Sequence, residues 1–260
     1  MSLSSYQNTW IEMLMYPERS AEILASTADL TPAERILLAA VSPERLQTIS
    51  KTVIYSRISA FVRVVPANLR SLLPADRLEA MARDYAYREP LASLYPLAQQ
   101  TRQWLDFLAA ALSAENEQHL RDLIRFEQLK SRFSHYEKPA PRQKLRGPVL
   151  SPACGLLLAS PDFAALLQAI WQEQSLPAYD NNTRQGYLVF ENPEREVGLL
   201  PLHWGLYHVL QTCNGQQSWA EVLDAVCKSH PELTADHSTL CQWEAYLRQR
   251  GWLRDWQSVA

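Results

Sequence analysis

The sequence lacks the long apolar run that a membrane-spanning helix needs, since no stretch approaches about 18 consecutive apolar residues. Its first ten residues, MSLSSYQNTW, have neither the basic region nor the apolar core of a signal peptide. Of its 260 residues, 47% are hydrophobic and 20% charged, which is ordinary for a globular protein. We therefore expect a cytoplasmic protein that makes no contact with a membrane.

Glycine is absent from the first 146 residues, and all seven glycines lie at or after Gly147. Because glycine costs about 1 kcal/mol inside a helix, its absence favours helical structure there. Pro32, Pro43 and Pro74 stand where they would begin helices, each followed by apolar residues at helical spacing. We expect residues 1–137 to form a helical bundle.

The second half of the chain is organised differently. Residues 138–148, KPAPRQKLRGP, are rich in proline and positive charge, which indicates a linker over residues 138–150. Beyond it, GLLLAS predicts a strand, and YLVFENPEREVGLL predicts a β-hairpin that turns at Asn192 and Pro193. Three helices should follow, the last one stopped by Gly251. The predicted fold class is α+β, with the helical bundle followed by a winged-helix-like domain over residues 151–260 that combines a hairpin or small antiparallel sheet with three helices.

Patterns that carry metal or catalytic chemistry are missing. The four cysteines form no CxxC pair, the six histidines are scattered, and neither HExxH nor a facial-triad spacing occurs. No nucleophile, base and orienting group can be assembled from the spacing. We expect no catalytic residue, no metal ligand and no cofactor in this chain, so an enzyme acting alone ranks last among the functions considered.

Charge separates two uses of a winged helix. Residues 1–146 carry 19 Lys and Arg against 16 Asp and Glu, whereas residues 147–260 carry 6 against 12, a net charge of −6. Affinity for DNA depends on cations that neutralise phosphates. A transcription regulator is therefore the weaker alternative, and we expect no nucleic-acid partner.

Peptide capture is the other use, because a hairpin with an unpaired edge offers backbone groups to an added strand. The last helix would form one wall of the groove. The same apolar stripes are also typical of core positions, and spacing alone favours the core for most of them. The candidate peptide-binding residues are Tyr187, Val189, Val197 and Leu199 on the hairpin and Leu240, Trp243, Tyr246, Leu247 and Arg250 on the helix.

Three arginines of the helical half, Arg57, Arg63 and Arg70, recur six and seven residues apart around Val65-Pro66. They are candidates for contact with an acidic partner surface. A solvated helix face explains the same spacing.

Residues 186–254 resemble the precursor-peptide recognition element of peptide natural-product pathways. The stretch YLVFENPEREVGLLPLHWGLYHVLQTCNGQQSWAEVL and the later RQRGWL carry this resemblance. The helical half, through SPERLQTISKTVIYSRISAFVRVVPANLRSLLPADRLEAMARDYAYREP and DLIRFEQLKSRFSHYEKP, is similar to partner subunits of TIM-barrel multi-iron enzymes, the methanobactin biosynthesis C subunit and the partner subunit of 3-thiaglutamate biosynthesis among them.

The resemblance implies a non-catalytic subunit that binds the leader of a ribosomally made precursor peptide. It would form a heterodimer with an iron-dependent TIM-barrel oxidase that modifies a core cysteine, giving an oxazolone and thioamide in the methanobactin case. An equivalent role in 3-thiaglutamate-type chemistry is the alternative. Iron would then belong to the partner enzyme.

Overall fold

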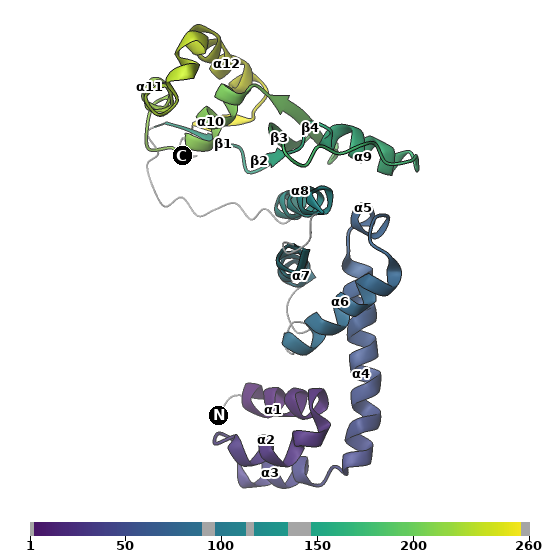
Figure 1. Ribbon diagram of the computed structural model, residues 1–260. Helices are drawn as coiled ribbons and strands as arrows, with labels where there is room; N and C mark the ends of the chain where they lie inside the picture. Colours follow the sequence, from purple (N-terminus) through teal and green to yellow (C-terminus); the bar gives the residue numbers. More distant parts are fainter. Residues whose placement is uncertain (1–2, 90–96, 113–116, 135–146, 256–260) are drawn as a thin grey trace. The chain divides into compact units, whose positions relative to one another are not determined.

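The computed structural model describes residues 3–89, 97–112, 117–134 and 147–255 (Figure 1). The chain divides into two compact units, Met1–Ala111 and Leu112–Ala260. The class is α+β: the N-terminal part is mostly helical, and small antiparallel sheets follow later. Among the described residues, no helix is both long enough and apolar enough to cross a bilayer.

Helices of the first unit begin at the signals expected from sequence. Thr31 caps a helix through a capping box with Glu34, and Pro32 occupies its first turn. Ser42 caps the next helix, which ends at Val64, just before Val65-Pro66. The elements are α1 (Leu3–Met15), η1 (Pro17–Arg19), α2 (Ser20–Ser26), α3 (Pro32–Ala39), α4 (Pro43–Val64), α5 (Ala67–Arg70), α6 (Ala75–Arg88) and α7 (Leu97–Leu112).

An aromatic cluster holds α4, α6 and α7 together. The rings of Phe61 and Tyr85 meet edge to face with centroids 4.8 Å apart, and Trp104 lies 4.9 Å from Tyr85. All three side chains are almost fully buried. Such aromatic pairs contribute more to the stability of a core than the burial of their apolar surface alone.

The described residues of the second unit form two antiparallel sheets. In the larger sheet the strand order is β2 (Cys154–Ala159), β3 (Gln185–Glu191), β4 (Val197–Leu202), so β3 is central. The smaller sheet pairs β1 (Pro148–Leu150) with β5 (Leu253–Asp255). The helices and the remaining 3₁₀ segment are α8 (Gln118–Ser134), α9 (Phe163–Trp171), α10 (Trp204–Thr212), α11 (Trp219–Ser229), η3 (Pro231–Asp236) and α12 (His237–Gln249).

Helices cover both faces of the larger sheet. A side chain added at Gly155 would meet Leu129 of α8, whereas one added at Gly186 would meet Tyr207 of α10. Figure 1 shows α8 and α10 on opposite sides of the strands. The face toward α10 joins α11 and α12 in one hydrophobic core that includes Leu188 and Leu202.

The division between the units differs from the boundary expected from sequence. We expected the helical half to reach residue 137, but α8 belongs to the second unit, where it packs on β2 and β3. Pro148–Leu150, expected in the linker, form strand β1. Residues 138–146 of that linker lie outside the described residues.

A buried carboxylate ties α8 to the sheet unit. The Asp122 side chain is fully buried and accepts hydrogen bonds from Tyr179 Oη at 2.7 Å and Gln118 Nε2 at 2.7 Å. The backbone N–H of Ser160 donates at 3.2 Å, and Arg184 Nη1 forms an ion pair at 2.9 Å. Burying a charge is tolerated when it is paired and fully hydrogen-bonded in this way.

We therefore expect Asp122→Ala to lower the free energy of unfolding by about 3–5 kcal/mol, because it leaves the Arg184 guanidinium without its counter-charge. Urea unfolding followed by circular dichroism measures the change. Asp224→Ala is the matched control, since Asp224 pairs with Lys228 on the surface, and it should cost less than about 1 kcal/mol. Equal costs for the two variants would contradict the role assigned to Asp122.

Candidate functional site

Strand β4 lies at an edge of the larger sheet. It pairs with β3 on one side, and no other strand of the described residues pairs with it. An edge strand presents unpaired backbone N–H and C=O groups to an incoming chain. The hairpin is therefore bounded by a potential docking edge along Val197–Leu202.

The register decides which groups of β4 are free. The Asn192 N–H donates to the Glu196 carbonyl at 2.9 Å, which closes the hairpin. Hydrogen-bonded pairs then alternate along the ladder, so Gly198, Leu200 and Leu202 bond to β3. The backbone groups of Val197, Leu199 and Pro201 point away from β3.

Pro201 fits this alternation. A proline has no N–H to give, and within sheets it is accepted where the missing N–H would face outward from an edge strand. Its partner across the ladder is Tyr187, a pair without hydrogen bonds in this register. The outer side of β4 thus offers the N–H groups of Val197 and Leu199 and three carbonyls.

Two of the candidate peptide-binding residues lie elsewhere. Tyr187 and Val189 are 2% and 0% exposed, on the sheet face that α8 covers. The Tyr187 hydroxyl donates to the carbonyls of Ser160 and Pro161, and burial raises its pKa to about 12. Because adjacent residues of a strand alternate between faces, this pair cannot line a groove shared with α12. Their assignment to that groove is corrected here.

The α12 candidates divide into two groups. Leu240 and Leu247 are 1% and 0% exposed and belong to the hydrophobic core. This agrees with the other interpretation of their spacing, in which they are core residues, and their assignment to the peptide groove is corrected. Trp243 and Tyr246 are half-buried, their ring centroids 5.3 Å apart, and Arg250 is exposed just past the helix. Val197 and Leu199 of β4 are also half-buried, but their side chains share the face of their β3 partners Glu191 and Val189, so they too cannot line a groove shared with α12.

A cavity of about 440 Å³ opens at the turn end of the hairpin. It is lined by the start of β2, the end of β3, the turn, and the chain that follows α12. Phe190 and Trp252 form an aromatic surface there, with centroids 4.5 Å apart. Sequence reasoning missed both, although YLVF contains Phe190 and RQRGWL contains Trp252. Gly198 lies opposite Phe190, whose ring occupies the space that a larger side chain would need.

The arginine candidates of the helical half also separate. Arg57 is 6% exposed, and its guanidinium donates to the Glu89 carbonyl at 2.7 Å and to the Met15 sulfur at 3.1 Å. Burial lowers its pKa. A side chain enclosed in this way cannot meet a partner surface, so its assignment is corrected. Arg63 and Arg70 are exposed and remain candidates.

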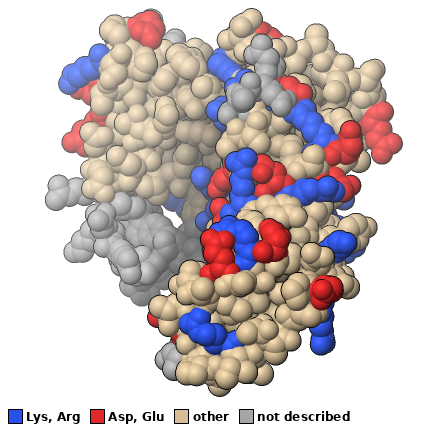
Figure 2. Space-filling view, turned by 60° about the horizontal axis from the view of Figure 1, so that its bottom comes forward, with Lys and Arg blue, Asp and Glu red and all other residues tan. Residues whose placement is uncertain are grey.

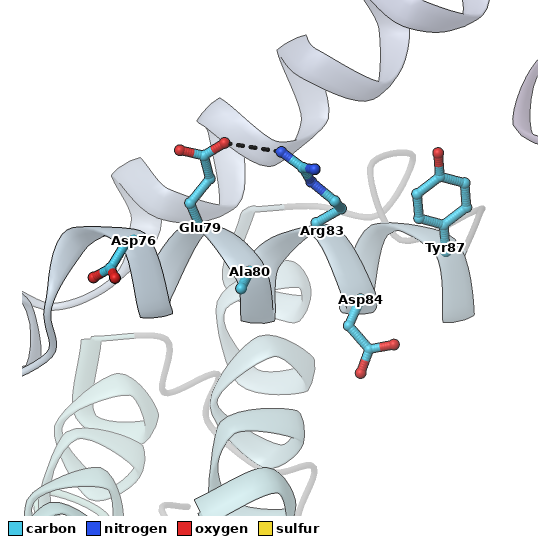
Figure 3. Close-up of a pocket in the computed structure, with 6 residues that line it drawn as sticks. All are labelled: Asp76, Glu79, Ala80, Arg83, Asp84 and Tyr87. Carbon is cyan, nitrogen blue, oxygen red and sulfur yellow. Dashed lines mark hydrogen bonds and ion pairs between the residues drawn. The ribbon is translucent and has the colours of Figure 1, made fainter.

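A hollow of the first unit lies along one face of α6 (Figure 3). Its volume is about 560 Å³, and the described residues that line it all come from that helix. Glu79 and Arg83 form an ion pair at 3.1 Å, with both side chains mostly exposed. This is a solvated helix face with i, i+4 pairing, and it brings no reactive groups together.

Within the described ranges, no three His, Cys, Asp or Glu side chains gather as a metal ion would need. On the face drawn in Figure 2, basic and acidic side chains interleave, and neither sign forms a broad patch. The candidate features are the β4 edge and, separately, the aromatic cavity beside the turn that precedes β4.

No protein-family model and no curated protein matches this sequence. The functional argument therefore depends on the β4 edge, the half-buried aromatics of α12 and the cavity beside the turn.

The cysteines provide a test of this arrangement. Burial raises the pKa of the Cys154 thiol to about 12, and burial with the nearby Glu244 does the same for Cys213. At pH 8 their thiolate fractions should be about a thousandfold below that of an ordinary thiol. We expect the exposed Cys241 to react first with a thiol reagent, and Cys154 and Cys213 to react only in denaturant. Mass spectrometry of the labelled peptides measures this, and rapid labelling of the half-buried Cys154 in folded protein would contradict the raised pKa attributed to its place at the start of β2.

Proposed function

We propose that this chain is a non-catalytic peptide-binding subunit that accepts an extended peptide as an added strand on β4. The observation that carries the proposal is the outward direction of the Val197 and Leu199 backbone groups on an edge strand. Strand addition draws its affinity from such backbone hydrogen bonds. Pro201 would limit the hydrogen-bond ladder between β4 and the peptide at its far end, because proline can accept a backbone hydrogen bond but has no N–H to donate.

Specificity would come from side chains beside the strand. The inner face of β4, through Leu200 and Leu202, shares one hydrophobic cluster with Trp243 of α12. Alternate side chains of an added strand would point toward that same face. The half-buried aromatics Trp243 and Tyr246 would therefore receive apolar peptide residues.

The nature of the peptide follows from the resemblance. The order of hairpin and three helices is that of a winged-helix-like unit, and this segment resembles a precursor-peptide recognition element. The proposed ligand is accordingly the leader of a ribosomally made precursor peptide. The proposed partner is a TIM-barrel multi-iron oxidase that modifies a core cysteine, with methanobactin-type oxazolone and thioamide formation preferred over 3-thiaglutamate-type chemistry.

Physical reasoning supports such a division of labour. A leader held on β4 makes attack on its attached core effectively intramolecular, at an effective concentration in the millimolar range for a short flexible tether. The oxidase can then accept varied core sequences, because recognition lies in the leader. Exposed Arg63 and Arg70 are the candidate contacts to that enzyme.

Placement on β4 has a sharp test, because β2 is the opposite edge of the same sheet. By the same alternation, the Leu156 N–H points outward from β2 as the Leu199 N–H does from β4. The probe is the peptide most enriched when random dodecapeptides are displayed and selected on the full-length protein. We expect Leu199→Pro to weaken binding of that peptide at least tenfold, since the substitution removes one outward donor and no β3–β4 hydrogen bond.

Leu156→Pro is the matched control and should leave the affinity within about threefold of wild type. Fluorescence anisotropy measures binding, and circular dichroism checks that both variants are folded. Loss of affinity in Leu156→Pro alone would place the peptide on β2 instead. Normal affinity in both folded variants would end the strand-addition model.

The partner proposal is tested separately. Produced with an affinity tag from its own genomic locus, the protein should co-purify with a second protein in a one-to-one complex. That partner should contain more than one iron ion per molecule by elemental analysis. Recovery of the chain alone at micromolar concentration, or with an iron-free partner, would count against an oxidase partner while leaving peptide capture intact.

A further inference from the structure

The six cations of residues 147–260 fall into two groups. Three have a close carboxylate partner: Arg184 with Asp122 at 2.9 Å, Lys228 with Asp224 at 3.0 Å and Arg248 with Glu244 at 2.7 Å. The other three are Arg195, Arg250 and Arg254, and all of them line the cavity at the hairpin turn. A segment with a net charge of −6 thus gathers its remaining positive charge at one place.

Carboxylates do not neutralise this group. Among the described residues, Glu191 is the one acidic residue that lines the cavity, and its carboxylate lies 3.5 Å from the Arg195 guanidinium, a long ion pair. Neither Arg250 nor Arg254 forms an ion pair within the described part of the chain. The described part of the lining thus holds three cations and one anion.

Arg195 occupies an unusual backbone position. Its φ of +67° is in the left-handed region, where glycine or asparagine is favoured. The Asn192 side chain accepts a hydrogen bond from the Glu196 N–H at 2.7 Å and helps to hold the turn. A positive φ strains the backbone of a residue with a side chain such as arginine, and residues with strained backbones cluster at ligand-binding sites.

The two other arginines are held beside aromatic rings and backbone. The Arg250 guanidinium lies 5.3 Å from the Tyr246 centroid and 5.9 Å from that of Trp252. Arg254 Nε donates to the Gly251 carbonyl at 3.3 Å. Cation–π contacts fix a guanidinium without neutralising its charge, so its N–H groups stay available to an anion.

We propose that this cavity binds a carboxylate side chain of the docked peptide, an Asp or Glu whose aliphatic stem packs on Phe190 and Trp252. The inference rests on the proposed peptide-binding function. Arginine recognises carboxylates through paired hydrogen bonds, and the aromatic surface suits a short apolar stem. The cavity is lined by Asn192, Pro193 and Arg195 of the turn that leads into Val197, so a peptide on β4 would have to extend past Val197 and along this turn to place a side chain in it.

The experiment uses displayed random dodecapeptides selected in parallel on full-length wild type, on Arg250→Gln/Arg254→Gln and on Lys228→Gln. Wild type should enrich an acidic residue at a fixed spacing from apolar positions. The double variant should keep the apolar pattern and lose the acidic one. Lys228→Gln removes an exposed cation outside the cavity and should select the same acidic residue as wild type.

Affinity then measures the contact directly. For the most enriched peptide, exchanging its acidic residue for the matching amide should weaken binding to wild type about tenfold or more, and should change binding to the double variant less than about threefold. A C-terminally amidated peptide should bind as the free acid does, because the proposed group is a side chain. Loss of affinity on amidation would mean that the cavity binds the C-terminal carboxylate of the peptide and not a side chain.

Two failures are distinguishable. Peptides enriched for apolar residues alone, with equal affinity for wild type and the double variant, would overturn the carboxylate site and leave strand addition intact. Selection that enriches no peptide would overturn both proposals together.

Discussion

The antiparallel register between β3 and β4 is the constraint on which the rest of this unit depends. Side chains and ladder hydrogen bonds both alternate with a period of two residues. A slip by one residue would turn Leu200 and Leu202 out of the core and would also turn the Leu199 N–H inward. The turn fixes the register through the Asn192 contacts to Glu196. Gly198 fixes it again, because no residue with a Cβ fits beneath the Phe190 ring.

Much of the local structure could be predicted from sequence because its signals are local. The helix starts at Pro32 and Pro43, the hairpin around Asn192-Pro193 and the stop at Gly251, with φ of +70°, all agree with the structure. Helix α8 shows where this reasoning ends. Its apolar stripe predicts that one face is buried, but the stripe does not say that the covering surface is a sheet beginning at Cys154.

The candidate site could be predicted in part. The run YLVF contains no polar residue, which is typical of a strand buried on both faces, and β3 is indeed the central strand. That pattern argued against placing Tyr187 and Val189 in an open groove. For Arg57 the sequence offers no comparable indication of burial, since the residues around it predict an ordinary amphipathic helix. The contacts with Glu89 and Met15 that enclose it are established only by the fold.

The arginine cavity could not have been read from sequence, because the turn and the end of α12 are more than fifty residues apart and meet only in the folded unit. The net charge of −6 over residues 147–260 gave no indication of this cavity, since a net charge does not say where the individual charges lie. The two facts are compatible physically. A polyanion such as DNA responds to charge over many phosphates, whereas one carboxylate responds to cations within a Debye length of about 8–10 Å. An acidic surface with one local group of arginines would therefore disfavour nucleic acid while still favouring a single carboxylate on an extended peptide.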